Sequence, residues 1–205
     1  LDSGVDEVAM ATTVDGAANV WLAGFSAQVK SASVETVTVA ADNPDAVTLE
    51  APQELRGDLN ILTVWKISPL GELLATYTYQ YDLPGLINSI SVNKTGLSIV
   101  GVLSERTFLQ NMSAAGAFSP QVSIGTSKTT INAVVRNSDG GSSLFGASTE
   151  TLGGKKLVGR EDGVLIKISK AGAIVSVVRS SAPKGYRTWN TATSALFLTG
   201  SVRSG

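Results

Sequence analysis

Short runs of apolar and β-branched residues, each closed by a tight turn, recur along most of the chain. The clearest example covers residues 61–104, reading ILTVWKISPLGELLATYTYQ and then, after a short link, LINSISVNKTGLSIVGVLS. Its two turns are Ser68-Pro69-Leu70-Gly71 and Asn93-Lys94-Thr95-Gly96. Apolar runs that flank Gly, Pro, Asn and Ser turns are typical of β-hairpins, so this stretch predicts two hairpins in succession.

The same two hairpins return along the chain, which indicates internal duplication. Turns of the first type lie at 68–71, 113–116 and 169–172, and turns of the second type open with Asp15, Asn93, Asn137 and Asn190. The last strand of each second-type hairpin carries a glycine near its end, namely Gly24, Gly101, Gly146 and Gly200. This glycine either permits a close approach near a hub or a bulge, or it simply ends the strand.

Two hairpins make a four-stranded antiparallel sheet, and radial packing of such sheets covers both apolar faces, as in a β-propeller. We therefore predict an all-β fold of propeller blades, with about three and a half blades in residues 1–205. We expect one propeller-like repeat domain, or part of one, with an insertion at about 27–59 that adds candidate strands at 34–40 and 46–51. The strands expected in the blades are 8–14, 19–25, 61–67, 72–80, 87–92, 97–103, 107–112, 117–124, 130–136, 142–148, 163–168, 173–179, 186–190 and 195–201.

Two motifs of the repeat resemble a known family. One is a turn followed by alternating apolar residues, glycine and a small polar residue, as in VDGAANVWLAGFS. The other centres on an apolar-Lys-apolar strand and a glycine turn, as in VWKISPLGELLATYTY and GVLIKISKAGAIVSVV. Together they resemble the blade repeat of secreted bacterial β-propeller proteins, an NHL-like repeat, although the middle copy departs from it at Gln110 and Asn111. The resemblance implies propeller blades and an exported protein, and it implies no particular activity.

Composition limits the chemistry that the chain can carry. Only 16% of the residues are charged and the net charge is −1, so no overall field attracts nucleic acid or an anionic membrane. Cysteine and histidine are absent, which excludes disulfides, Cys/His zinc sites and triads that need either residue. No apolar run is long enough for a transmembrane helix. We expect no cofactor, no metal site, no nucleic-acid partner and no membrane insertion.

Few residues suggest a binding site. Tyr77, Tyr79 and Tyr81 alternate and therefore project from one face of a strand. That face is either a binding patch for a partner or glycan, or core covered by the insertion or by a neighbouring blade. The pair Glu161-Asp162 is interpreted as turn and solvated residues rather than as an acid/base pair. The stretch 137–141 lacks the later ligands of a calcium loop and is interpreted as a hairpin turn.

These observations predict a non-catalytic, exported or cell-surface module for binding or scaffolding, and we assign no catalytic residue. One alternative is a propeller lyase or hydrolase whose channel site lacks His and Cys, recognisable by converging carboxylates or a Lys–Tyr pair. Another is a structural subunit of a larger surface assembly. The chain starts at Leu1 without a signal-like segment, so we expect a processed protein or a piece of a longer one. The family resemblance implies a location outside the cell or in the cell envelope.

The last expected strand indicates how a partner could bind. In a half blade, the strand at Ala195–Gly200 would leave an unpaired apolar edge, and such edges pair readily with other chains. We therefore expect this strand to pair with chain outside the segment or with a second copy. The predicted partner is a protein or the chain itself, bound through strand edges.

Overall fold

Fourteen antiparallel strands make up the regular structure of the described residues. The computed structural model describes residues 4–28, 57–194 and 197–204, and this part of the chain contains no helix. The strands are β1 (Glu7–Val14), β2 (Val20–Ser26), β3 (Ile61–Ile67), β4 (Leu73–Gln80), β5 (Gly85–Asn93), β6 (Gly96–Leu103), β7 (Arg106–Ser113), β8 (Val122–Ser123), β9 (Thr129–Arg136), β10 (Ser142–Ser148), β11 (Asp162–Ile168), β12 (Ile174–Ser180), β13 (Tyr186–Ser194) and β14 (Phe197–Arg203).

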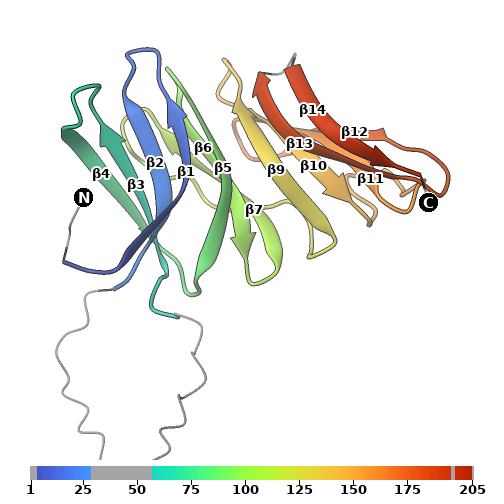
Figure 1. Ribbon diagram of the computed structural model, residues 1–205, viewed down its shortest axis with the longest axis horizontal. Coiled ribbons are helices and arrows are strands. Elements are labelled where there is room, and N and C mark those ends of the chain that lie inside the picture. Colours follow the sequence, from blue (N-terminus) through green and yellow to red (C-terminus); the bar gives the residue numbers. More distant parts are fainter. Residues whose placement is uncertain (1–3, 29–56, 195–196, 205) are drawn as a thin grey trace, which may run out of the picture.

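These strands form three four-stranded sheets and one hairpin, in the orders β1-β2-β3-β4, β5-β6-β7-β8, β9-β10-β11-β12 and β13-β14. Figure 1 shows the sheets following one another along the long axis, from β1–β4 at one end to the β13–β14 hairpin at the other. The first strands of the sheets, β1, β5, β9 and β13, contact one another in that order, and we call them the inner strands. The described chain therefore forms three and a half β-propeller blades, as the repeat predicts.

The blade boundaries differ from the repeat unit suggested by the sequence. Residues 61–104 are divided between two blades, because β3 and β4 complete the first sheet while β5 and β6 begin the second. In the second blade the sheet continues from β6 to β7. The turn between these two strands contains Ser104 and Glu105, whose φ angles are 44° and 63°. Two left-handed central residues make the tight turn that places consecutive strands side by side. Grouping 61–104 as one sheet is therefore wrong.

Strand β8 is much shorter than the expected 117–124. It pairs with β7 only through Val122 and Ser123, although Phe118 forms an isolated bridge to Met112. Pro120, which lies between these contacts, has no backbone N–H to donate to the ladder. The outer edge of the second blade is therefore interrupted at this proline.

A bulge recurs in every inner strand, opposite the repeated glycine. The register shifts by one residue at Met10, Asn88, Asn132 and Asn190, next to the pairs made with Gly24, Gly101, Gly146 and Gly200. A Cβ on Gly146 would lie 1.9 Å from the carbonyl oxygen of Thr130, and one on Gly101 would lie 2.0 Å from that of Leu86. Of the alternatives left open by the sequence, the structure shows the bulge, because only glycine allows so close an approach.

The bulge also corrects the position of the last turn. Asn190 does not open a turn: it is the bulge residue of β13, which continues to Ser194. The error arises because asparagine occupies both positions in the repeat, at bulge residues such as Asn132 and at turn residues such as Asn137. Consequently β13 and β14 both extend further along the chain than expected.

Two apolar clusters fill the spaces between successive blades. The cluster between the first and second blades includes the fully buried side chains of Phe25, Leu62, Leu97 and Phe108. The cluster between the second and third blades includes those of Val100, Leu109, Ile131 and Leu144. Neighbouring residues of β6 contribute to different clusters because successive side chains of a strand face opposite sides. The second blade therefore buries both of its faces.

The polar residues at which the middle copy departs from the repeat form buried hydrogen bonds. Gln110 Oε1 accepts a hydrogen bond of 2.8 Å from the hydroxyl of Tyr81. Asn111 Oδ1 accepts hydrogen bonds from Ser98 Oγ at 2.7 Å and from Arg136 Nη1 at 2.9 Å. Arg136 belongs to β9, so this network ties the third blade to the second. A buried polar network of this kind is stabilising only while all its members are present.

Some expectations fall outside the described residues, including the candidate strands at 34–40 and 46–51. The strands that flank the insertion pair directly, with Ser26 opposite Ile61. Within the described chain β14 pairs with β13 alone, and the pairing of its outer edge with another chain stays a prediction. No helix capable of spanning a membrane occurs in the described ranges.

Substitution of Gly146 tests the bulge. We expect Gly146→Ala to lower the free energy of unfolding by about 2–3 kcal/mol, because the new methyl group would displace the Thr130 carbonyl from its position. Urea denaturation followed by far-ultraviolet circular dichroism measures the change. The control is Gly16→Ala, since nothing lies within 4 Å of a Cβ at Gly16. Equal stability of the two variants would contradict the role assigned to the bulge.

Candidate functional site

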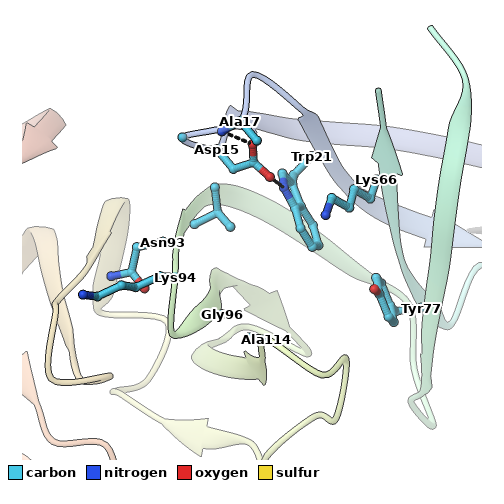
Figure 2. Close-up of a pocket in the computed structure, with 11 residues that line it drawn as sticks. Asp15, Ala17, Trp21, Lys66, Tyr77, Asn93, Lys94, Gly96 and Ala114 are labelled. Carbon is cyan, nitrogen blue, oxygen red and sulfur yellow. Dashed lines mark hydrogen bonds between the residues drawn. The ribbon is translucent and has the colours of Figure 1, made fainter. Parts of the chain in front are cut away.

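A pocket of about 330 Å³ opens where the first blade meets the turn between β5 and β6. Figure 2 shows residues of the β1–β2 turn, of β2, β3 and β4, and of the second blade around it. Its lining combines one carboxylate, two amines and two aromatic rings with small residues: Asp15, Gly16, Ala17, Trp21, Lys66, Tyr77, Val92, Asn93, Lys94, Gly96 and Ala114. Aromatic and charged side chains meeting in one hollow make it the best candidate site on the described chain.

Asp15 organises the turn at one side of this pocket. Its Oδ1 accepts hydrogen bonds from the backbone N–H groups of Ala17 and Asn19, both at 2.9 Å. Its Oδ2 accepts from Asn19 Nδ2 at 2.9 Å and from the indole Nε1 of Trp21 at 3.0 Å. A short polar side chain that binds the backbone two residues ahead is typical of a tight turn. Here the same carboxylate also fixes the orientation of the indole.

The floor of the pocket is an aromatic and cationic stack on the first blade. Trp21 of β2 lies directly opposite Lys66 of β3, and the Lys66 ammonium nitrogen is 5.1 Å from the centroid of the indole ring. Tyr77 of β4 stacks on Trp21 with ring centroids 6.2 Å apart and planes 9° from parallel. An amine over an indole face is attracted by the ring quadrupole. This contact keeps a positive charge at the pocket while Trp21 itself is almost completely buried.

The second blade contributes Asn93 and Lys94. The Asn93 amide donates to the backbone carbonyls of Arg136 and Asn137, both at 3.0 Å, so its NH₂ group is occupied by the third blade. Lys94 is exposed, and Figure 2 shows its ammonium directed away from Trp21. Because the side chain is long and exposed, rotation about its own bonds is enough to bring the charge to a bound group. The pocket therefore has one positioned cation and one adjustable cation.

The lowered pKa of Asp15 reflects the hydrogen bonds that its carboxylate accepts from the turn and from Trp21. Partial desolvation opposes ionisation, but the hydrogen bonds from Trp21, Asn19 and Ala17 outweigh it and lower the pKa of Asp15 from 3.8 to about 2. The group is therefore a carboxylate at every pH above about 4. It neither donates nor accepts a proton near neutrality.

The structure separates the three tyrosines named in the sequence. Tyr77 lines the pocket, whereas Tyr79 and Tyr81 pack between the first and second blades. The Tyr81 ring is 5.8 Å from that of Phe108 and 6.1 Å from that of Phe25, and burial raises the pKa of its hydroxyl. A binding role for the three residues together stays a prediction. Their common face is the one turned toward the second blade.

Asp162 differs from its sequence interpretation as a solvated turn residue. Its side chain is fully buried, and its Oδ2 lies 3.2 Å from Arg179 Nη1. Burial opposes ionisation, but hydrogen bonds from the backbone N–H groups of Val158 and Gly159, together with Arg179, lower its pKa. Asp162 is therefore a structural anion, and the solvated interpretation is wrong. Proximity of Arg179 could not be inferred because it lies on another strand.

The stretch 137–141 forms the hairpin turn expected from its sequence. The N–H of Gly140 donates to the carbonyl of Asn137 at 3.0 Å, and Asp139 Oδ1 accepts from the N–H of Gly141 at 2.8 Å. Within the described ranges, no three side chains of Asp, Glu, His or Cys gather as a metal site would require. The Asp139 carboxylate is instead part of the turn.

The hydrogen bond between Trp21 and Asp15 generates a titration test. Trp21→Phe removes the indole donor and should raise the pKa of Asp15 from about 2 toward its ordinary value of 3.8. Because the folded pKa lies below the unfolded one, ionised Asp15 stabilises the fold above about pH 4 and this contribution is lost as the pH falls toward 2. Carboxyl ¹³C NMR measures the titration. Trp65→Phe is the matched control, and an unchanged pKa in Trp21→Phe would contradict the assignment.

Comparisons with known proteins give little beyond the fold. No protein-family model matches the chain, and no curated protein matches it by sequence. One solved structure that it resembles is a catalytically inactive virginiamycin B lyase from Staphylococcus aureus with quinupristin. That likeness covers 97% of this chain and 85% of the lyase chain at 10% identity and a TM-score of 0.35. So distant a likeness carries no statement about activity.

Proposed function

We propose that this chain is a non-catalytic β-propeller module that binds an acidic group in the pocket between its first two blades. The observation that carries the proposal is that Lys66, 5.1 Å from the Trp21 centroid, lines the same pocket as the exposed Lys94. An amine held in place by an indole can meet an incoming carboxylate without first being ordered. A carboxylate-bearing ligand fits this chemistry best.

The condition of Asp15 supports binding rather than proton transfer. It is the one carboxylate among the lining residues, and hydrogen bonds to the β1–β2 turn and to Trp21 occupy both of its oxygens. Its pKa of about 2 leaves it ionised at neutral pH, far from the range suited to a general acid or base. The chain also contains no histidine or cysteine to take that role.

The repeat motifs support an exported location. Their resemblance to the NHL-like blade repeats of secreted bacterial propellers supports our proposal that this module lies outside the cell or in the cell envelope. A sequence without cysteine folds under oxidising as well as reducing conditions, which is compatible with that location. The proposed role is to hold an acidic ligand or partner at that surface.

One observation favours a second function, that of a lyase. Lys66 and Tyr77 line the same pocket, and a lysine and a tyrosine together can remove and return a proton in an elimination. Against this, both side chains pack on Trp21, one over its ring and one stacked against it. Turnover of an acidic oligosaccharide, lost in Tyr77→Phe, would establish the lyase and reject the non-catalytic module.

Binding is tested with small acidic probes. We expect trigalacturonate or a triglutamate peptide to perturb the NMR signals of the Trp21 indole, with a neutral trisaccharide as the negative probe. Lys66→Met keeps an apolar stem over Trp21 but removes the charge, so affinity should fall about tenfold. Comparison of the two acidic probes distinguishes a sugar ligand from a peptide ligand.

The matched control is Lys156→Met, because Lys156 is exposed and does not line the pocket. It should bind the acidic probes as the unaltered protein does. Equal affinity in Lys66→Met and Lys156→Met would contradict the proposed site.

A further inference from the structure

The inner strand of the half blade exposes three polar residues, Asn190, Thr191 and Thr193. Asn190 is the bulge residue of β13, and Thr191 pairs with Thr199 of β14. Among the described residues, no hydrogen bond from these three side chains is found. The same sequence pattern, an asparagine followed by hydroxyl residues at the first and third positions, occurs in β5 as Asn88, Ser89 and Ser91. Ser91 pairs with Ser98 in regular register, whereas Thr193 is the unpaired residue of a second register shift in β13.

In β5 this triplet binds the backbone of the next inner strand. Asn88 Nδ2 donates to the carbonyl of Ile131 at 2.8 Å. Ser89 Oγ accepts from the N–H of Val134 at 3.3 Å, and Ser91 Oγ accepts from the N–H of Arg136 at 2.9 Å. All three contacts are made to main-chain atoms. The triplet therefore recognises the edge of a bulged inner strand and not the side chains that the strand carries.

The full triplet is not a general feature of the repeat. The corresponding residues of β9 are Asn132, Ala133 and Val135, and there Asn132 alone reaches β13, donating to the carbonyl of Trp189 at 2.9 Å. The two hydroxyl residues therefore occur at the junction in which two N–H groups of the neighbouring strand edge are bound. Their presence on the exposed face of β13 marks that face as continuous with the established interface between blades.

We propose that β13 binds the inner strand β1 of a second copy of this chain. Counted from the bulge at Met10, residues Ala9, Thr12 and Val14 of β1 correspond to Ile131, Val134 and Arg136 of β9. They are exposed, and β1 is the edge of its sheet. The amide of Asn190 donates to the carbonyl of Ala9 of the second copy, and the two threonine hydroxyls accept from the N–H groups of its Thr12 and Val14.

The β1 strand that binds β13 belongs to another molecule, because β1 and β13 of one chain lie at opposite ends of the row of blades. Figure 1 shows the blade that contains β1 and the β13–β14 hairpin at opposite ends of the row. The β13 end offers side chains and the β1 end offers backbone groups. The contact is therefore head-to-tail, and it differs from a symmetric pairing of two strand edges. This mode differs from pairing through the outer edge of β14, which uses the backbone of both partners.

Sedimentation velocity on the 205-residue protein at rising concentration tests the proposal. We expect a dimer or larger species, and at least about tenfold weaker association in the triple variant Asn190→Ala, Thr191→Val and Thr193→Val. Val14→Pro, which removes one backbone donor from the edge strand β1, should weaken association as well. Thr199→Val with Ser201→Ala on β14 is the matched control and should associate normally. Circular dichroism confirms that each variant is folded.

Mixing the two defective proteins gives the sharper test. The triple variant keeps an intact β1 and Val14→Pro keeps an intact β13, so an equimolar mixture should form a one-to-one complex although neither associates alone. Association through β14 edges would instead persist in both variants. A monomeric unaltered protein, or normal association of the folded triple variant, would overturn the proposal.

Discussion

The blades of this protein depend on a backbone bulge that is possible only opposite glycine. At Gly24, Gly101, Gly146 and Gly200 the neighbouring inner strand comes so close that a Cβ would overlap its carbonyl oxygen, at 1.8 to 2.2 Å. The extra residue changes the direction of one side chain in each inner strand. In two blades that side chain is an asparagine bound to the next inner strand, and in the first blade the N–H of Ile87 donates to the sulfur of Met10. The glycine therefore sets how one blade joins the next.

The pocket arises from a local change in this repeated plan. The position of Asp15 in the first blade is occupied by Asn137 in the third, and the residue six positions further is Trp21 in one and Ser143 in the other. Both pairs form a side-chain hydrogen bond across the hairpin. Only the first pair places an indole beside a lysine and under a tyrosine. In the third blade a lysine, Lys167, also lies opposite the equivalent residue, but that residue is Ser143 and has no ring. The scaffold is repeated, whereas the candidate site belongs to a single junction.

Strands and turns, which depend on residues close together in the sequence, were predicted. Features that depend on contacts between different strands were missed. Alternation and turn residues located the strands, since Ser68 and its repeats form the expected tight turns. Asn190 was assigned to a turn because bulge and turn both use asparagine, and the difference is a matter of register between strands. The burial of Asp162 beside Arg179 requires two paired strands in their final register, and the gathering of Trp21, Lys66 and Tyr77 requires three. No local spacing encodes them.

Recognition of backbone by side chains fixes the order of the second and third blades. Two bare strand edges pair with little regard to register or direction, which makes them prone to aggregation. A bulge asparagine and two hydroxyl groups at fixed offsets accept only an edge whose carbonyl and N–H groups match them, as those of Ile131, Val134 and Arg136 do. Such an interface also has a direction, because the side chains lie on one blade and the backbone groups on the next. Blades joined in this way have a direction, and on our proposal the exposed threonines of β13 extend it to a second copy of the chain.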